Sequence, residues 1–150
     1  MKISKAIKQE KFKSNQNMAI INILYTSNWL KDYYKSIFDP FELKSQHYNV
    51  LRILKGRYPN ATSPGEIKEV MLDKAPDLTR LIDKLVLMKL VDRNSCSENR
   101  RKVDVLINKK GIELLGQIDI KMNVFDENYK LKLNDEEAEQ LSNLLDKLRS

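Results

Sequence analysis

The stretch from Val91 to Gly111 constrains the fold more than any other part of the chain. Two short segments of β-forming residues, Leu90 to Arg93 and Val103 to Ile107, flank a polar loop. The loop contains three consecutive cations at positions 100–102. The pattern predicts an antiparallel β-hairpin with a positively charged tip.

Two helices are expected directly before the hairpin. Ser63 and Glu66 have the spacing of a capping box around Pro64, which predicts the start of a short helix. Pro76 is expected at the first helical position of the next helix, with Asp77 where the helix dipole favours an anion. One face of that second helix is apolar and carries Leu78, Leu81, Ile82, Leu85 and Met88.

The opposite face of the second helix is polar and includes Thr79, Arg80, Asp83 and Lys84. Arg80 and Lys84 are expected to project from it together. Helix, turn, helix and basic hairpin is the plan of a winged helix-turn-helix, whose second helix enters the major groove of DNA. There an arginine can contact guanine or a phosphate. Without the hairpin, the pattern of this helix would be explained equally by an ordinary amphipathic surface helix. The hairpin that follows favours the DNA-binding interpretation.

Further helices are expected before this segment. Apolar residues recur at spacings of three and four over residues 3–38, with a break near Ser14 to Asn17, and Asp39-Pro40 ends the run. A second helix is expected to begin near Ser45. Its predicted apolar stripe consists of His47, Leu51, Leu54 and Tyr58.

Two helices are expected after the hairpin. Asn108 can cap a helix that starts at Lys109 and fades near Asn128. Asn134 and Glu137 repeat the capping pattern and open a last helix. That helix carries leucines at heptad-like spacing, at positions 141, 144, 145 and 148.

These elements predict a mainly α (α+β) protein with one domain over residues 1–150. Residues 45–108 are expected to form the winged helix-turn-helix lobe, and residues 1–38 and 109–150 a helical dimerisation region. The apolar stripes of the terminal helices need a partner surface. A homodimer is expected because DNA half-sites about one turn apart require two linked readers.

The net charge of +6 is unevenly distributed. The first 60 residues hold 11 cations and four anions, whereas residues 111–150 hold five cations and nine anions. The basic excess therefore lies in the first 60 residues and in the hairpin. This distribution favours a polyanionic partner such as nucleic acid, with a solvated charged face as the alternative.

The composition argues against an enzyme. The chain has one histidine and one cysteine, so it has neither an internal disulfide nor a thiolate cluster for zinc. It lacks a glycine-rich phosphate loop and the H-E-x-x-H spacing. We therefore expect no metal and no cofactor. Cys96 is expected to be an exposed thiol, with a redox switch as the alternative role. The protein is expected to be soluble and cytoplasmic, without membrane spans.

The sequence resembles the MarR family of bacterial transcription regulators. Leu78 to Leu85, L-T-R-L-I-D-K-L, resembles the recognition helix of the family, and Leu90 to Arg93 the strand that follows. Ser97 to Arg101, S-E-N-R-R, is similar to the wing sequence that usually ends in D-R-R, and Leu106 to Gly111 is similar to L-T-x-x-G. The likeness extends over residues 45–116.

The resemblance implies a dimer, a palindromic operator in double-stranded DNA that is usually repressed, and a wing that reaches the adjacent minor groove. Arg100 or Arg101 would contact that groove, which suits a mobile cationic tip. Asn99 stands where the family usually has Asp, so a neutral hydrogen bond replaces any salt bridge to these arginines. Lys89 stands where a helix-ending Gly is common. The candidate DNA-contacting residues are Ser63, Pro76, Asp77, Thr79, Arg80, Lys84, Asn99, Arg100, Arg101 and Lys102.

Family members often sense small, commonly phenolic anions in a cleft between the dimerisation helices and the DNA-binding lobe. The resemblance therefore implies release of a repressor from DNA by such an effector. Plain core or interface packing is the alternative role for the residues that would line the cleft. A winged helix that binds other proteins, without operator-specific DNA reading, is the alternative function. The candidate pocket residues are Trp29, Tyr33, Tyr34, His47 and Tyr48.

Overall fold

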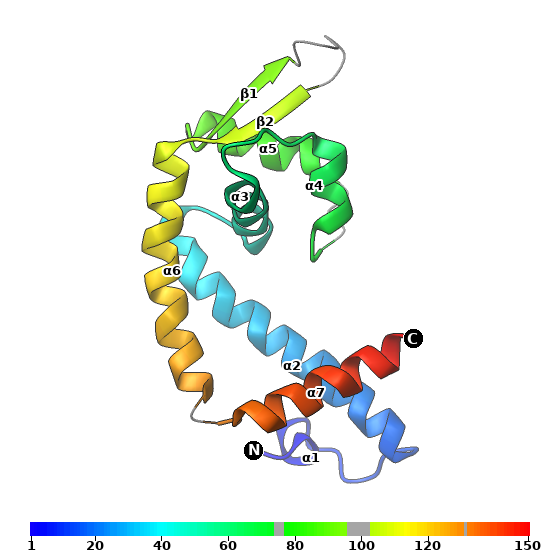
Figure 1. Cartoon of the computed structure of the whole chain (residues 1–150). Coiled ribbons are helices and arrows are strands. Elements are labelled where there is room, and N and C mark those ends of the chain that lie inside the picture. Colours follow the sequence, from blue (N-terminus) through cyan, green and yellow to red (C-terminus); the bar gives the residue numbers. More distant parts are fainter. Residues whose placement is uncertain (74–76, 96–102, 131) are drawn as a thin grey trace. The chain divides into compact units, whose positions relative to one another are not determined.

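The computed structural model of the chain describes residues 1–73, 77–95, 103–130 and 132–150 (Figure 1). These residues form a mainly helical structure with one two-stranded antiparallel sheet. The chain divides into two compact units, Met1–Ser45 and Gln46–Ser150.

The first unit contains a short helix α1 (Ile3–Ala6), a long helix α2 (Asn15–Phe38) and a 3₁₀ turn η1 (Asp39–Phe41). Ser14 caps α2, because its hydroxyl oxygen accepts a hydrogen bond of 3.1 Å from the backbone N–H of Asn17. A break in the first helical run is confirmed, but it covers residues 7–14, and the expectation that it extends from Ser14 to Asn17 is wrong because α2 already begins at Asn15. The expected end of α2 at the Asp-Pro pair is also confirmed.

The second unit begins with α3 (Ser45–Arg57) and the short helix α4 (Pro64–Val70). The predicted capping box of α4 is present. The backbone N–H of Ser63 donates to Glu66 Oε2 at 2.8 Å, and the backbone N–H of Glu66 donates to Ser63 Oγ at 3.3 Å. Hydrogen bonds from Ser63 lower the pKa of Glu66, and the nearby Arg57 guanidinium adds to this effect. The ion pair between Arg57 Nη1 and Glu66 Oε1, at 3.2 Å, also joins the end of α3 to the start of α4.

Helix α5 (Leu78–Leu87) begins later than the sequence pattern suggested. Asp77 is its N-cap residue, and Asp77 Oδ1 accepts a hydrogen bond of 3.2 Å from the backbone N–H of Arg80. The expectation that Pro76 occupies the first helical position is wrong, because the carboxylate of the next residue caps the helix instead. Pro76 itself lies outside the described residues.

A Schellman motif ends α5. Lys89 adopts a left-handed conformation with φ of 59°, where a glycine would avoid strain. Its N–H donates to the Val86 carbonyl at 2.8 Å, and the N–H of Leu90 donates to the Leu85 carbonyl at 2.9 Å. Both hydrogen bonds satisfy carbonyl groups of the last turn, and the chain then enters the first strand directly.

The predicted hairpin is confirmed as β1 (Val91–Ser95) and β2 (Val103–Ile107), which pair antiparallel with Val91 opposite Ile107. Thr62 extends the sheet beyond β2 through two backbone hydrogen bonds with Val105, of 2.9 and 3.0 Å. The segment before α4 is therefore attached to the hairpin. The tip at positions 96–102, which includes Cys96, lies outside the described residues.

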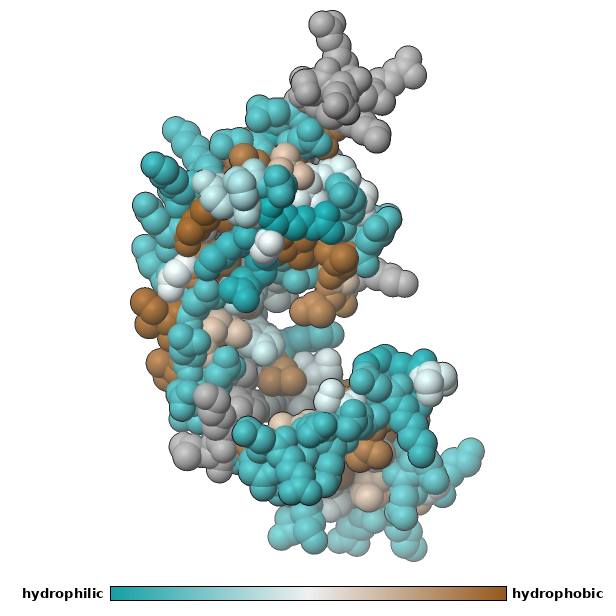
Figure 2. Space-filling view, viewed as in Figure 1, coloured by the Kyte–Doolittle hydropathy of each residue, from teal (hydrophilic) through white to brown (hydrophobic). Residues whose placement is uncertain are grey.

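Two capped helices follow the hairpin, as predicted. In α6 (Lys109–Lys130), Asn108 Oδ1 accepts a hydrogen bond of 3.1 Å from the backbone N–H of Gly111. In α7 (Asp135–Arg149), Asn134 and the third helical residue form a complete capping box. Apolar side chains remain exposed on α6, and Figure 2 shows apolar surface in brown where Figure 1 draws this helix.

The core of the second unit takes apolar residues from all of its elements except α7. Tyr58, which belongs to the predicted apolar stripe, is 50% exposed instead, and so is Val70, the last residue of α4. Tyr58 lies beyond the end of α3, so it does not follow the apolar face of that helix. The fully buried side chains include Val50, Leu51, Leu54, Ile67, Ile82, Leu85, Val105, Ile107, Leu115 and Ile118.

Gly111 lies where the first turn of α6 passes the end of α5. A Cβ atom at this position would overlap the carbonyl oxygen of Leu90 and would lie 2.7 Å from Ile107 Cγ1. A backbone carbonyl cannot move aside as a flexible side chain can. The residue is therefore required for close approach of two backbones.

Replacing Gly111 by alanine is expected to lower the free energy of unfolding by about 1–3 kcal/mol, the usual effect of overpacking a tight site. Gly116→Ala is the matched control, because Gly116 lies in the same helix and a Cβ atom there would have no neighbour within 4 Å. The control should raise the free energy of unfolding by about 0.5–1 kcal/mol. Urea unfolding of both variants measures the effect, and equal stability of the two would contradict the close approach.

Candidate nucleic-acid interface

Helix α5 presents a polar face on the surface of the second unit. Leu78, Leu81, Ile82 and Leu85 are buried, so the other side of the helix carries the remaining side chains outward. Thr79 and Arg80 are exposed, and Lys84 is partly exposed. The apolar and polar faces are therefore those that the sequence predicted.

Arg80 is the most accessible charged group described on this face. Its side chain is 86% exposed, and its Nε atom lies 2.8 Å from Asp77 Oδ2. Asp77 thus caps the helix with one carboxylate oxygen and orients the Arg80 guanidinium with the other. Because Nε makes this contact, the terminal Nη groups are left for a bidentate contact with a guanine base or a phosphate.

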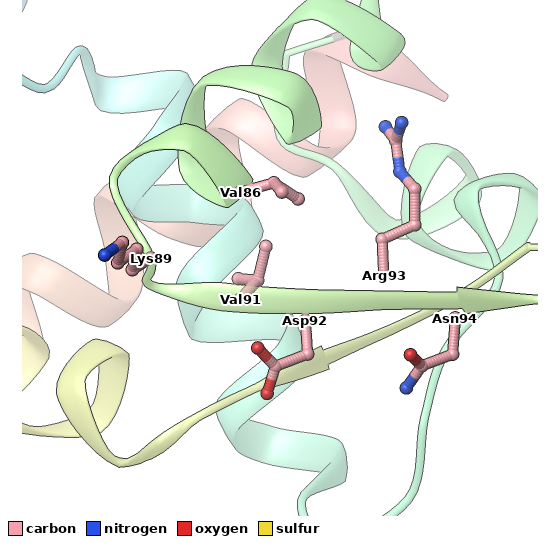
Figure 3. A pocket seen from close by; sticks show the side chains of 6 residues that line it. All are labelled: Val86, Lys89, Val91, Asp92, Arg93 and Asn94. Atoms are coloured by element: carbon pink, nitrogen blue, oxygen red, sulfur yellow. The ribbon is translucent and has the colours of Figure 1, made fainter.

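A second arginine ties the hairpin to α5. Arg93 Nη1 of β1 lies 2.7 Å from Asp83 Oδ1 on the outer side of α5. Figure 3 shows Arg93 and Val91 on the side of β1 that faces α5, whereas Asp92 and Asn94 point to the opposite side. This alternation is the normal pattern of a strand. The ion pair holds the hairpin in a fixed direction relative to the exposed face of α5.

The base of the hairpin is held from the start of α6. Asn108 Nδ2 donates to Asp92 Oδ1 at 3.3 Å and to the Lys89 carbonyl at 3.1 Å. Lys110 Nζ donates to the Met88 carbonyl at 3.0 Å, where a cation also interacts favourably with the C-terminal end of the α5 dipole. An open hollow lies beside these contacts, lined by the six residues labelled in Figure 3.

Two cations at the surface of α5 are paired with acids. Arg80 is paired with Asp77, and Arg93 is paired with Asp83. Lys84 adds a further positive charge on α5, and the sequence places three more cations at positions 100–102. The predicted contact residues at the hairpin tip, Asn99, Arg100, Arg101 and Lys102, lie outside the described residues.

The residues predicted for an effector pocket are divided between the two units. Trp29, Tyr33 and Tyr34 lie on α2, where the Tyr33 and Tyr34 rings meet edge to face at a centroid distance of 6.4 Å. His47 and Tyr48 lie on α3, with His47 buried. The two groups belong to different units, and the pocket between them stays a prediction.

Tyr48 takes part in a cluster that the sequence did not reveal. Its hydroxyl donates to Asp119 Oδ1 at 3.1 Å, while Asp119 Oδ2 lies 3.4 Å from Arg52 Nη1 and 3.6 Å from Lys55 Nζ. Burial raises the pKa of Tyr48 to about 12, and the negative charge of Asp119 adds to the effect. The sequence signal that could have indicated this cluster is the acidic residue Asp119 next to Ile118, an apolar residue that the structure buries.

Neither a metal site nor a membrane span is found in the described part of the chain. Its residues include no group of three or more histidine, cysteine, aspartate or glutamate side chains that could hold a metal ion. Within the same residues, no helix combines the length and the apolar character needed to cross a membrane.

No family model matches the sequence. Comparison with solved structures finds a MarR transcription factor from Planctomyces limnophilus at 32% sequence identity and a TM-score of 0.71, covering 91% of this chain and 98% of that one. A putative MarR-like transcription regulator from Bacillus cereus matches at 20% identity and a TM-score of 0.79, with 90% and 96% coverage. The MepR protein of S. aureus in a DNA complex matches at 18% identity and a TM-score of 0.76, also with 90% and 96% coverage.

Proposed function

The chain belongs to the MarR family, and from this membership we propose that it is a sequence-specific DNA-binding transcription regulator that acts as a homodimer. The observation that carries the proposal is the geometry of α5. Its apolar face is buried, Thr79 and Arg80 are exposed on the other face, and the adjacent hairpin is fixed to it by Arg93. The structural likeness to a regulator in complex with DNA supports the same use of the fold.

In this proposal the exposed face of α5 enters the major groove. Arg80 would contact a guanine or a phosphate, while Thr79 and Lys84 contact neighbouring bases or the backbone. Ser63, at the start of α4, would contact the phosphate backbone. The hairpin tip would reach the adjacent minor groove, where a narrow groove attracts cations. The remaining proposed contacts are Pro76, Asp77, Asn99, Arg100, Arg101 and Lys102.

Exposed apolar side chains support the homodimer. Ile120 and Val124 on α6 are 67% and 61% exposed, and Leu144 and Leu148 on α7 are 64% and 57% exposed. Large apolar groups gathered on helices in this way usually mark an interaction surface. A second copy of the chain would cover them and place two α5 helices on the two halves of a palindromic operator.

We further propose that the regulator represses and that a small phenolic or anionic effector releases it from DNA. The aromatic side chains Trp29, Tyr33 and Tyr34 of α2, with His47 and Tyr48 of α3, would contact that effector. Trp29 is 43% exposed, so part of its side chain lies at the surface.

The pairing of Arg80 and Arg93 with acids favours one alternative function. A winged helix in which these two cations are already paired could bind another protein without reading an operator. Weak DNA binding that ignores both sequence and salt concentration would support this alternative. Operator binding through phosphate contacts should instead weaken steeply as salt rises, because cations are released from DNA when the protein binds.

Arg80→Ala is expected to weaken operator binding by about 1–3 kcal/mol, the usual effect of removing a base or groove contact. Arg149→Ala is the matched control, because Arg149 is also an exposed arginine paired with an acid three residues away, Asp146. A gel-shift titration on an operator selected from fragments of the source genome measures both variants.

The control should bind like the unchanged protein. Equal affinities of the Arg80 variant, the Arg149 variant and the unchanged protein would contradict the proposed role of α5.

The homodimer predicts a particle of about twice the chain mass of 17.6 kDa. Light scattering at micromolar concentration measures this mass. Val124→Glu would place a charge in the proposed apolar interface and should shift the mass toward that of one chain. A single-chain mass for the unchanged protein would show that the exposed faces of α6 and α7 have another use.

A further inference from the structure

Three donors of α3 converge on one carboxylate of α6. Tyr48, Arg52 and Lys55 follow one another at spacings of four and three, so they lie along one side of α3. Their polar atoms lie 3.1, 3.4 and 3.6 Å from the carboxylate oxygens of Asp119. Tyr48 and Asp119 are 71 residues apart in the sequence.

The cluster lies beside the buried apolar stripe of α6. Leu115 and Ile118 are fully buried, and Asp119 follows them with a side chain that is 28% exposed. Apolar packing is not directional, so by itself it tolerates small shifts of one helix along another. A carboxylate that accepts hydrogen bonds from Tyr48 and Arg52 and forms an ion pair with Lys55 is directional and favours a single register.

The Tyr48 hydroxyl is a hydrogen-bond donor at neutral pH, as in any tyrosine, and burial raises its pKa further to about 12. Arg52 and Lys55 are 50% and 38% exposed, so solvent screens their attraction to Asp119. The cluster therefore contributes the small free energy of a partly exposed ion pair, and this contribution is present only when α3 and α6 lie in the observed arrangement.

We propose that Asp119 is a positioning residue that fixes the register of α6 against α3 and thereby sets the spacing between the two operator half-sites that the dimer recognises. The inference rests on the proposed function. Helix α3 belongs to the DNA-binding lobe, and α6 continues from β2 to the exposed apolar residues Ile120 and Val124. A shift of α6 by one helical residue is about 1.5 Å, a sizeable fraction of the roughly 3.4 Å between neighbouring base pairs.

The test compares operators that differ only in spacing. The probes are an operator fragment selected from the source genome and the same fragment with one base pair inserted or removed at its centre. Gel-shift titrations give the ratio of the dissociation constants for altered and original spacing. Asp119→Asn keeps the side-chain volume and an acceptor for Tyr48 but removes the charge that holds Arg52 and Lys55. This substitution should lower the ratio by about threefold, the scale of a partly exposed ion pair.

Glu113→Gln is the matched control, because it removes the same charge from an exposed position of the same helix. Its ratio should equal that of the unchanged protein. Arg52→Gln is a second variant that tests the same contact from α3, where its exposed side chain leaves the core intact. It should lower the ratio in the same direction as Asp119→Asn.

The readout separates positioning from stability. If Asp119→Asn and Arg52→Gln weaken binding equally at every spacing, or leave all affinities unchanged, the inference is overturned and the proposed function stands. An unchanged protein that binds all spacings equally well overturns it too. If the unchanged protein selects no operator at all, the proposed function itself fails.

Discussion

The close approach of Gly111 to the carbonyl group of Leu90 is the constraint on which the second unit depends. It lets the first turn of α6 pass directly over the turn that connects α5 to β1. The backbone N–H of Asn108 donates to the same Leu90 carbonyl at 3.3 Å. Three elements are therefore held at one point, namely the candidate recognition helix, the hairpin and the helix that carries the exposed apolar residues.

Side-chain contacts extend this arrangement in two directions. Arg93 and Asp83 join β1 to the outer face of α5, so the ion pair connects the two candidate DNA-contacting elements. Asp119 fixes α6 relative to α3 through Tyr48 and two cations. Both contacts are partly exposed, and their main effect is on geometry. A regulator that must fit two half-sites needs such directional contacts in addition to a buried core.

Features set by neighbouring residues could be predicted from the sequence. The caps at Ser63 and Asn134 were predictable because a capping box needs only residues three positions apart. The hairpin was predictable because two β-forming segments flank a polar loop. The start of α5 was placed too early, since Pro76 and Asp77 are both helix-starting residues and only the geometry assigns the cap to Asp77.

Features set by distant residues could not be predicted. The partners of Asp119 lie on α3, and the partner of Arg93 lies on α5, and these pairings depend on how the helices pack. The same limit applies to the dimer and the effector pocket, which depend on surfaces brought together from separate parts of the chain. The apolar stripes of the terminal helices predicted a partner surface, and the family resemblance supplied the effector pocket.

Methylation interference tests most directly whether the exposed face of α5 reads bases in the major groove. Guanine N7 lies in that groove and is an acceptor for arginine. We expect methylation of at least one guanine in each half-site to block binding of the unchanged protein, and Arg80→Ala to become insensitive to methylation at that guanine. An identical interference pattern for both proteins, or an absence of interference at any guanine, would contradict base reading by Arg80.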